Sequence, residues 1–72
     1  MIKTLTKVNS SMVYAVGYDP DEELLEVVFT SGKIWGYENV PKEEYKSLIN
    51  SRSIGSYMKE NIIDCYPDFS IS

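Results

Sequence analysis

Three stretches of the chain show the residue pattern of β-strands. They cover residues 12–18, 24–29 and 33–37, and each is rich in β-branched or aromatic residues or alternates between apolar and polar positions. In the second stretch apolar residues occupy both alternating faces, and Phe29 is the largest of them. A strand that is apolar on both faces is typical of the centre of a sheet, so we expect residues 24–29 to be the central strand.

The connections between these stretches carry turn residues. Asp19 is followed by Pro20, and an aspartate side chain accepts hydrogen bonds from the backbone ahead of it while proline fixes φ at the next position. The second connection contains Gly32, which can take the positive φ of a tight hairpin. Together these signals predict a three-stranded antiparallel meander.

Beyond residue 40 the apolar spacing changes from a period of 2 to a period of 3.6. Pro41 suits the first turn of a helix, and Leu48 lies on its apolar stripe. Asn50 ends this helix, Ser53 can cap a second one, and Tyr57 lies on the inner face of the second. The predicted fold is α+β: a three-stranded antiparallel β-meander followed by two short α-helices packed on the sheet.

The two ends of the chain carry weaker signals. Residues 1–8 are polar and rich in threonine and lysine, which predicts an arm or an irregular edge strand. Pro67 stops the second helical region, and residues 68–72 are expected to be a tail. With 72 residues, no internal repeat and no linker, residues 1–72 are predicted to form a single domain.

The inventory of reactive side chains is small. The chain has no histidine and one cysteine, so it can form neither an intrachain disulfide nor a serine–histidine or cysteine–histidine catalytic pair. Cys65 is interpreted as a small packed hydrophobe more readily than as a nucleophile. The acidic turn after Asp19 lacks the ligand spacing of a calcium loop and is expected to be a solvated surface. We therefore expect no cofactor, no metal and no catalysis.

Charge and hydropathy constrain the partners. The formal net charge is −4, which disfavours nucleic acid because phosphate binding depends on lysine and arginine. The excess of acids is too small to make mimicry of DNA the first choice. No apolar run is long enough for a membrane span and no signal peptide is visible, so the expected location is the cytoplasm, where a lone thiol stays reduced.

Aromatic side chains are the first candidate for a binding surface. They lie on adjoining predicted strands and could share one face of the sheet; these are Trp35, Tyr37, Tyr14 and Tyr18. Exposed rings on a sheet can anchor a protein partner or stack on bases. The competing interpretation, which we favour for most of the group, places these rings in the core, and Trp35 is then the best single candidate for an interface anchor.

Basic side chains are the second candidate surface. An RNA-binding role requires the basic residues of the meander and the helices to gather on one side; these are Lys33, Lys42, Lys46, Arg52 and Lys59. The first helix alternates lysines with glutamates, which is more typical of a solvated surface.

The order of motifs along residues 8–67 resembles the KTSC domain, a family named after the C-terminal region of certain lysyl-tRNA synthetases. The motifs that carry the resemblance are Ser10-Ser11, Val16-Gly17-Tyr18-Asp19, Leu25-x-Val27-x-Phe29-x-x-Gly32, Trp35-Gly36-Tyr37, Val40-Pro41, Ser53-x-Gly55-x-Tyr57-Met58 and Tyr66-Pro67. The chain departs from the family pattern at Trp35, where tyrosine is usual, at Lys59, where asparagine is usual, and at Asp68, where an aromatic is frequent. The resemblance implies structural roles for Gly17 and Gly55, at points where backbones approach closely, and no established activity.

The sequence leaves three functions open. The first is a non-catalytic protein-interaction or regulatory module, of the kind that phages and mobile elements encode. The second is an RNA- or tRNA-binding accessory domain, which the synthetase connection of the family suggests. The third is an enzyme or metal protein of unrecognised type. A homodimer formed through an open sheet edge is compatible with each of them.

Overall fold

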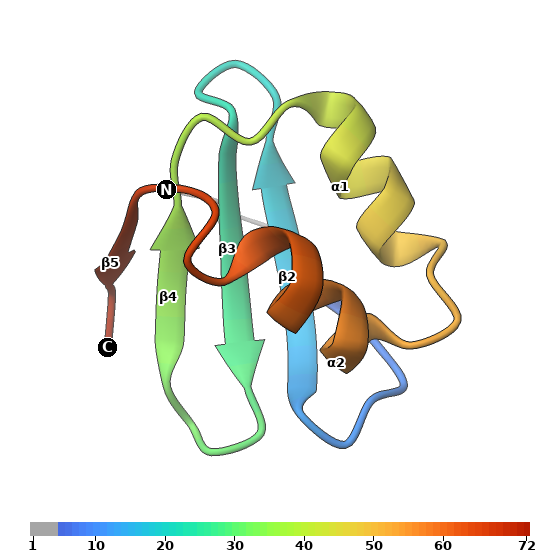
Figure 1. Cartoon of the computed structure of the whole chain (residues 1–72). Coiled ribbons are helices and arrows are strands. Elements are labelled where there is room, and N and C mark those ends of the chain that lie inside the picture. The colour runs from blue at the N-terminus through green and yellow to red at the C-terminus, as the bar shows by residue number, and fades with distance from the viewer. Residues whose placement is uncertain (1–4) are drawn as a thin grey trace.

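The computed structural model describes residues 5–72 and shows one sheet with the helices on one of its faces (Figure 1). The elements, in chain order, are β1 (Thr6–Lys7), β2 (Val13–Asp19), β3 (Leu24–Phe29), β4 (Ile34–Tyr37), α1 (Lys42–Ile49), α2 (Ile54–Tyr57), the π-helical segment η1 (Met58–Ile62) and β5 (Asp68–Ser70). The spatial order of the strands is β1-β2-β3-β4-β5, and every neighbouring pair is antiparallel.

The α+β class and the central place of residues 24–29 are confirmed, whereas the three-stranded sheet was wrong. The predicted meander is present as β2, β3 and β4, and the sheet gains one short strand at each edge. Residues 6–7 of the N-terminal segment pair with β2, while residues 1–4 lie outside the described part of the chain. The expected tail supplies β5, which pairs with β4.

The C-terminal segment escaped prediction because it is too short and too polar to show alternation. Its only large apolar residue within the strand is Phe69, and the strand begins directly after Pro67. Backbone hydrogen bonds beyond the strand add to the pairing: the Ile34 amide donates to the Ser72 carbonyl at 3.0 Å, and the Ile71 amide donates to the Ile34 carbonyl at 2.8 Å. These bonds order the chain up to its last residue.

The turn predictions are confirmed in detail. The Asp19 Oδ1 atom accepts hydrogen bonds from the amides of Asp21, at 3.0 Å, and Glu22, at 3.4 Å. Gly32 has a φ of +96°, which explains the glycine in the second hairpin. One irregularity was not predicted: the register between β2 and β3 shifts at Tyr14, which forms a β-bulge.

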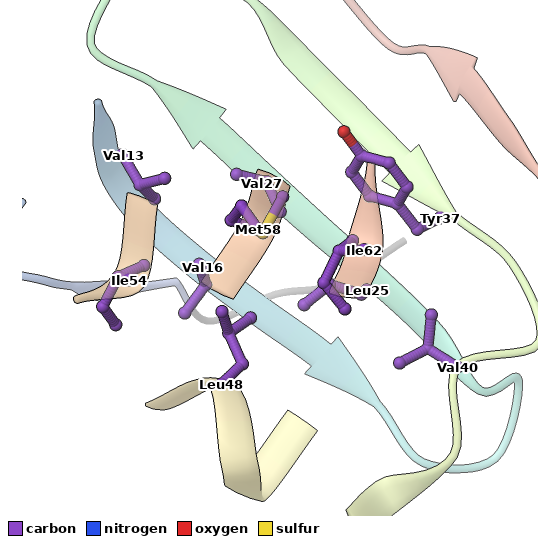
Figure 2. Packing of buried hydrophobic residues seen from close by; sticks show 10 residues of the cluster. All are labelled: Val13, Val16, Leu25, Val27, Tyr37, Val40, Leu48, Ile54, Met58 and Ile62. Carbon is purple, nitrogen blue, oxygen red and sulfur yellow. The ribbon is translucent and has the colours of Figure 1, made fainter. Parts of the chain in front are cut away.

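The core lies between the helices and the sheet (Figure 2). Val16, Val27 and Trp35 are cross-strand neighbours on the helix-facing side of the sheet. Leu48, predicted to be structural, is fully buried, and Phe29 and Tyr57 pack against the core from partly buried positions. The ten buried residues of the cluster are Val13, Val16, Leu25, Val27, Tyr37, Val40, Leu48, Ile54, Met58 and Ile62.

Both predicted helices are present, and the second changes its pitch. The side chain of Ser53 accepts a hydrogen bond from the Ser56 amide at 3.3 Å, so the predicted cap is confirmed. From Met58 onward the segment widens into a π-helix, where the Ile63 amide donates to the Met58 carbonyl at 2.7 Å. The widened turn keeps both Met58 and Ile62 fully buried.

A carboxylate joins the two helical regions. The hydroxyl of Tyr66 donates to Glu44 Oε1 at 2.8 Å, and the hydroxyl of Tyr57 donates to Glu44 Oε2. Glu44 lies on α1, Tyr57 ends α2 and Tyr66 follows η1, so one side chain holds three segments together.

Candidate functional site

A polar hollow lies between the loop of residues 9–12 and the segment of residues 52–59. It encloses about 300 Å³, and we call it the serine lobe. Its lining residues are Asn9, Ser10, Ser11, Met12, Arg52, Ser53, Ile54, Gly55, Ser56 and Lys59. The chain thus brings together two short segments that are at least 40 positions apart in the sequence.

A second hollow adjoins the first and is less polar. It encloses about 550 Å³, and we call it the apolar lobe. Its apolar contacts come from Val8, Tyr45, Ile49 and Ile54, and Ile49 is 42% exposed. The remaining lining residues are Thr6, Lys7, Asn9, Ser51 and Arg52. Because Asn9, Arg52 and Ile54 line both lobes, the two are neighbouring parts of one concave region, which we call the groove.

The walls of the serine lobe are held by local hydrogen bonds. On one wall, Ser10 Oγ accepts bonds from the amides of Met12, at 3.1 Å, and Val13, at 3.2 Å, which fixes the loop that enters β2. On the other wall, the Ser53 cap begins α2. Both serines therefore shape the site, and both line it.

Gly55 lies where the two walls meet. A Cβ atom at this position would be 3.5 Å from Met12 Cβ and 3.7 Å from Ser10 Oγ, which are ordinary contact distances. A close approach of backbone elements was expected at Gly55, but the nearest neighbours are side chains, and an alanine would fit. At Gly36, by contrast, a Cβ atom would collide with the ring of Phe69.

The groove has a positive local charge on an acidic protein. Lys7, Arg52 and Lys59 line it, and among the lining residues in the described chain there is no aspartate or glutamate. Within residues 5–72, the side chains of Arg52 and Lys59 make neither a hydrogen bond nor an ion pair. Both cationic groups are therefore available to a ligand. The Lys7 Nζ atom lies 5.2 Å from the centroid of the Tyr14 ring.

The four aromatic candidates do not form one surface. Tyr37 is only 3% exposed and belongs to the core, and Trp35 is partly buried against it. Tyr18 stacks on Tyr45 with ring centroids 4.8 Å apart, and its hydroxyl donates to the Val40 carbonyl. Tyr14 is 49% exposed and lies beneath Lys7, away from the other three.

The tyrosine hydroxyls are kept protonated by their surroundings. Burial, followed by the charges of Asp68 and Asp64, raises the pKa of Tyr37 to about 12. Burial and the hydrogen bond to Glu44 raise the pKa of Tyr66 to about 12. The pKa of Tyr57 is also raised, chiefly by its hydrogen bond to Glu44. These groups hold the fold together, and none of them lines the groove.

The basic candidates divide into two sets. Arg52 and Lys59 share the serine lobe. Lys42 and Lys46 are exposed on α1, and Lys33 is exposed in the hairpin before β4. The five cations therefore do not line one common hollow.

Sequence reasoning missed the residues that give the serine lobe its polar character. Ser10 and Ser11 were used only as part of the family resemblance, and Ser53 only as a helix cap. Ser56 and the groove cation Lys7 carried no signal of their own. A hint was available in the repeated serines at positions 51, 53 and 56 beside Arg52, but nothing in the sequence placed them next to residues 9–12.

The described part of the chain, residues 5–72, holds no group of three or more histidine, cysteine, aspartate or glutamate side chains able to bind a metal ion. None of its helices is both long enough and apolar enough to cross a membrane.

Comparison with known proteins places the chain in a family. The model of the KTSC domain matches residues 9–66. A protein of Stutzerimonas stutzeri described as uncharacterized is 39% identical over 51 residues, which cover 71% of this chain and 72% of that protein. A protein of Tsukamurella paurometabola is also 39% identical over 51 residues, covering 71% and 76% of the two chains. The crystal structure of a KTSC domain protein from Yersinia pestis superposes with a TM-score of 0.93 at 26% identity, covering 96% of this chain and 97% of the other. The resemblance seen in the sequence is thereby confirmed, and the chain belongs to the KTSC domain family.

Proposed function

We propose that this KTSC domain is a non-catalytic binding module that holds an extended segment of a protein partner in the groove. The observation that carries the proposal is the pairing of an apolar lobe with a positively charged polar lobe across shared residues. A peptide offers both kinds of group within a few residues.

The apolar lobe supplies the favourable contact area. Ile49 projects from the end of α1 and is 42% exposed, although it is a large aliphatic residue. Burying such a side chain against a partner contributes about 1 kcal/mol or more. Tyr45 and Ile54 lie beneath it as part of the domain's own packing, so the floor of the lobe is already ordered before a partner binds.

The serine lobe supplies direction and selectivity. Arg52 and Lys59 attract acidic groups, and the net charge of −4 repels acidic chains elsewhere on the surface. A partner segment with an apolar residue next to an acidic one is the best complement to this arrangement. Among the described residues, the groove is lined by no histidine, cysteine, aspartate or glutamate, and no hydrogen bond joins Lys59 to a serine that it could activate. Cys65 was expected to be a small packed hydrophobe, but it is exposed. The reduced cytoplasm remains the compartment that a lone exposed thiol fits best.

RNA binding remains the second candidate, because Arg52 and Lys59 lie together in one hollow. Single-stranded RNA binders usually combine a basic track with exposed rings that stack on bases. Here the rings of Tyr37 and Trp35 are turned into the core, and the other cations lie on different parts of the surface. These features favour a protein partner.

Selection from a phage-displayed library of random peptides tests the proposal. The whole 72-residue chain is immobilised, and enriched peptides are then tested against variants. We expect an enriched motif with an apolar and an acidic position, whose binding is lost in Ile49→Asp and in Arg52→Glu. Lys33→Glu changes charge by the same amount as Arg52→Glu outside the groove and is expected to bind normally. Peptides that bind all three variants equally would overturn the proposal. So would the absence of any enriched peptide together with a low-salt gel shift of single-stranded RNA.

A further inference from the structure

We infer that the serine lobe is a site for a single phosphate group carried by the side chain of a protein partner, that is, for a phosphorylated residue. The inference rests on the proposed function, because it names the chemical group that the partner brings into one lobe of the groove. It is carried by the hydrogen-bonding state of the serines and by the two unpaired cations.

The serine hydroxyls of the lobe have protons to donate to a ligand. Ser10 Oγ accepts two backbone hydrogen bonds and therefore keeps its proton for another acceptor. Ser53 donates its hydroxyl proton to Ser56 Oγ at 3.0 Å, so Ser56 also keeps its own proton free to donate. Hydroxyl protons from opposite walls of the lobe can thus point toward one acceptor group between them.

Two positive charges, those of Arg52 and Lys59, lie beside these hydroxyls in the lobe. Ser56 and Lys59 are three positions apart on one helical segment and lie on the same face of it, while Arg52 precedes the cap of that segment. A guanidinium carries up to five donors and an ammonium three. A phosphomonoester carries close to two negative charges at neutral pH and three terminal oxygens, which matches two cations and several hydroxyls better than a carboxylate does.

The phosphate group could come from a nucleic acid or from a phosphorylated peptide. A nucleic acid presents a phosphate at every nucleotide, and a chain of such charges would meet the acidic surface of this protein outside the lobe. A phosphorylated peptide presents one phosphate and can place an apolar neighbour in the apolar lobe beside it. The adjoining apolar contacts therefore favour the protein-bound group.

Titration of the isotope-labelled full chain, followed by NMR amide shifts, tests the site. The probes are O-phosphoserine, inorganic phosphate and, at matched ionic strength, acetate. We expect saturable shifts at residues 10–12 and 53–56 with both phosphates, and at least about tenfold weaker binding of acetate. In the Arg52→Gln/Lys59→Gln double variant phosphate binding should also fall by about tenfold or more, whereas the control Lys42→Gln/Lys46→Gln, which removes the same charge from α1, should keep it.

The contrary outcomes are distinct from those of the peptide selection. Shifts that do not saturate, equal binding of acetate, or phosphate binding that persists in the Arg52→Gln/Lys59→Gln variant would overturn the phosphate site even if selected peptides still bind the groove. Saturable phosphate binding without any selected peptide would uphold the site and count against the peptide-binding function. A 5′-phosphorylated oligonucleotide that binds more tightly than O-phosphoserine would overturn the assignment to a protein partner.

Discussion

The ring of Phe69 lies directly on Gly36, which is its cross-strand partner between β4 and β5. A Cβ atom at position 36 would be only 2.8 Å from Phe69 Cε1 and 2.9 Å from Cε2, so no larger residue fits beneath the ring as it stands. Phe69 itself is 39% exposed and forms part of the sheet surface away from the helices. The missing side chain at Gly36 is what lets the C-terminal strand lie flat against the sheet.

Replacing Gly36 with alanine should therefore loosen β5. We expect a loss of about 1–2 kcal/mol in the free energy of unfolding, because the ring of Phe69 must move aside. Urea denaturation followed by tryptophan fluorescence measures this loss. In a double-mutant cycle, Phe69→Ala should remove at least about half of the cost of Gly36→Ala, since the obstacle is then gone. Costs that simply add would show that the ring does not constrain position 36.

Alkaline pH should destabilise the domain through its buried tyrosines. Burial raises the pKa values of Tyr37 and Tyr66 from the ordinary 10.0 to about 12. The folded state therefore holds these protons more tightly than the unfolded chain does, so their stabilisation is complete below pH 10 and is lost as pH rises toward 12. Urea midpoints at about pH 8 and about pH 11 should fall less in Tyr37→Phe than in the parent protein. An equal fall in both proteins would contradict a buried, protonated Tyr37.

Glu44 should stabilise the fold by accepting hydrogen bonds from two tyrosine hydroxyls. In Glu44→Gln the hydroxyls of Tyr57 and Tyr66 lose a carboxylate partner, and we expect a loss of about 1 kcal/mol because the site is only partly buried. Glu43→Gln, at the exposed position just before Glu44 on α1, is the matched control and should cost less than about 0.5 kcal/mol. Thermal unfolding of both variants measures the difference. Equal losses in the two variants would point to a general effect of helix charge and not to the hydrogen bonds of Glu44.

Trp35 should behave as a core residue. It packs on the helix-facing side of the sheet beside Val27, so Trp35→Ala is expected to cost about 3 kcal/mol and to lower the melting temperature strongly. Tyr14→Ala, which removes an exposed ring from β2, is expected to change the melting temperature little. If Trp35→Ala unfolds no more easily than Tyr14→Ala, the indole is available to a partner after all.

The elements with a clear local code were predictable from the sequence. Period-2 alternation predicted the meander, and Ser53 predicted the start of α2 as its cap. Gly32 predicted the second hairpin, where it takes the positive φ that the turn needs. The two edge strands were not predictable, because β1 has two residues and β5 has three, which is too few for a pattern to show. Their positions depend on pairing with strands already in the sheet.

The groove was only partly predictable, for a similar reason. Arg52 and Lys59 were chosen from the sequence for their charge, but so were cations that the fold places elsewhere. For the aromatic candidates the sequence left core and surface open and favoured the core for most of them; Tyr37 is buried and Tyr18 stacks on Tyr45. A site formed between two distant loops has no periodicity, and its members are recognised only when the chain has folded.

The most direct test of the groove as the binding surface is the affinity of a selected peptide, measured by isothermal titration calorimetry against matched variants. We predict that Ile49→Asp and Arg52→Glu each weaken binding by about tenfold or more, while Lys33→Glu leaves the dissociation constant within about twofold of the parent value. Unchanged affinity in both groove variants would contradict a binding surface in the groove.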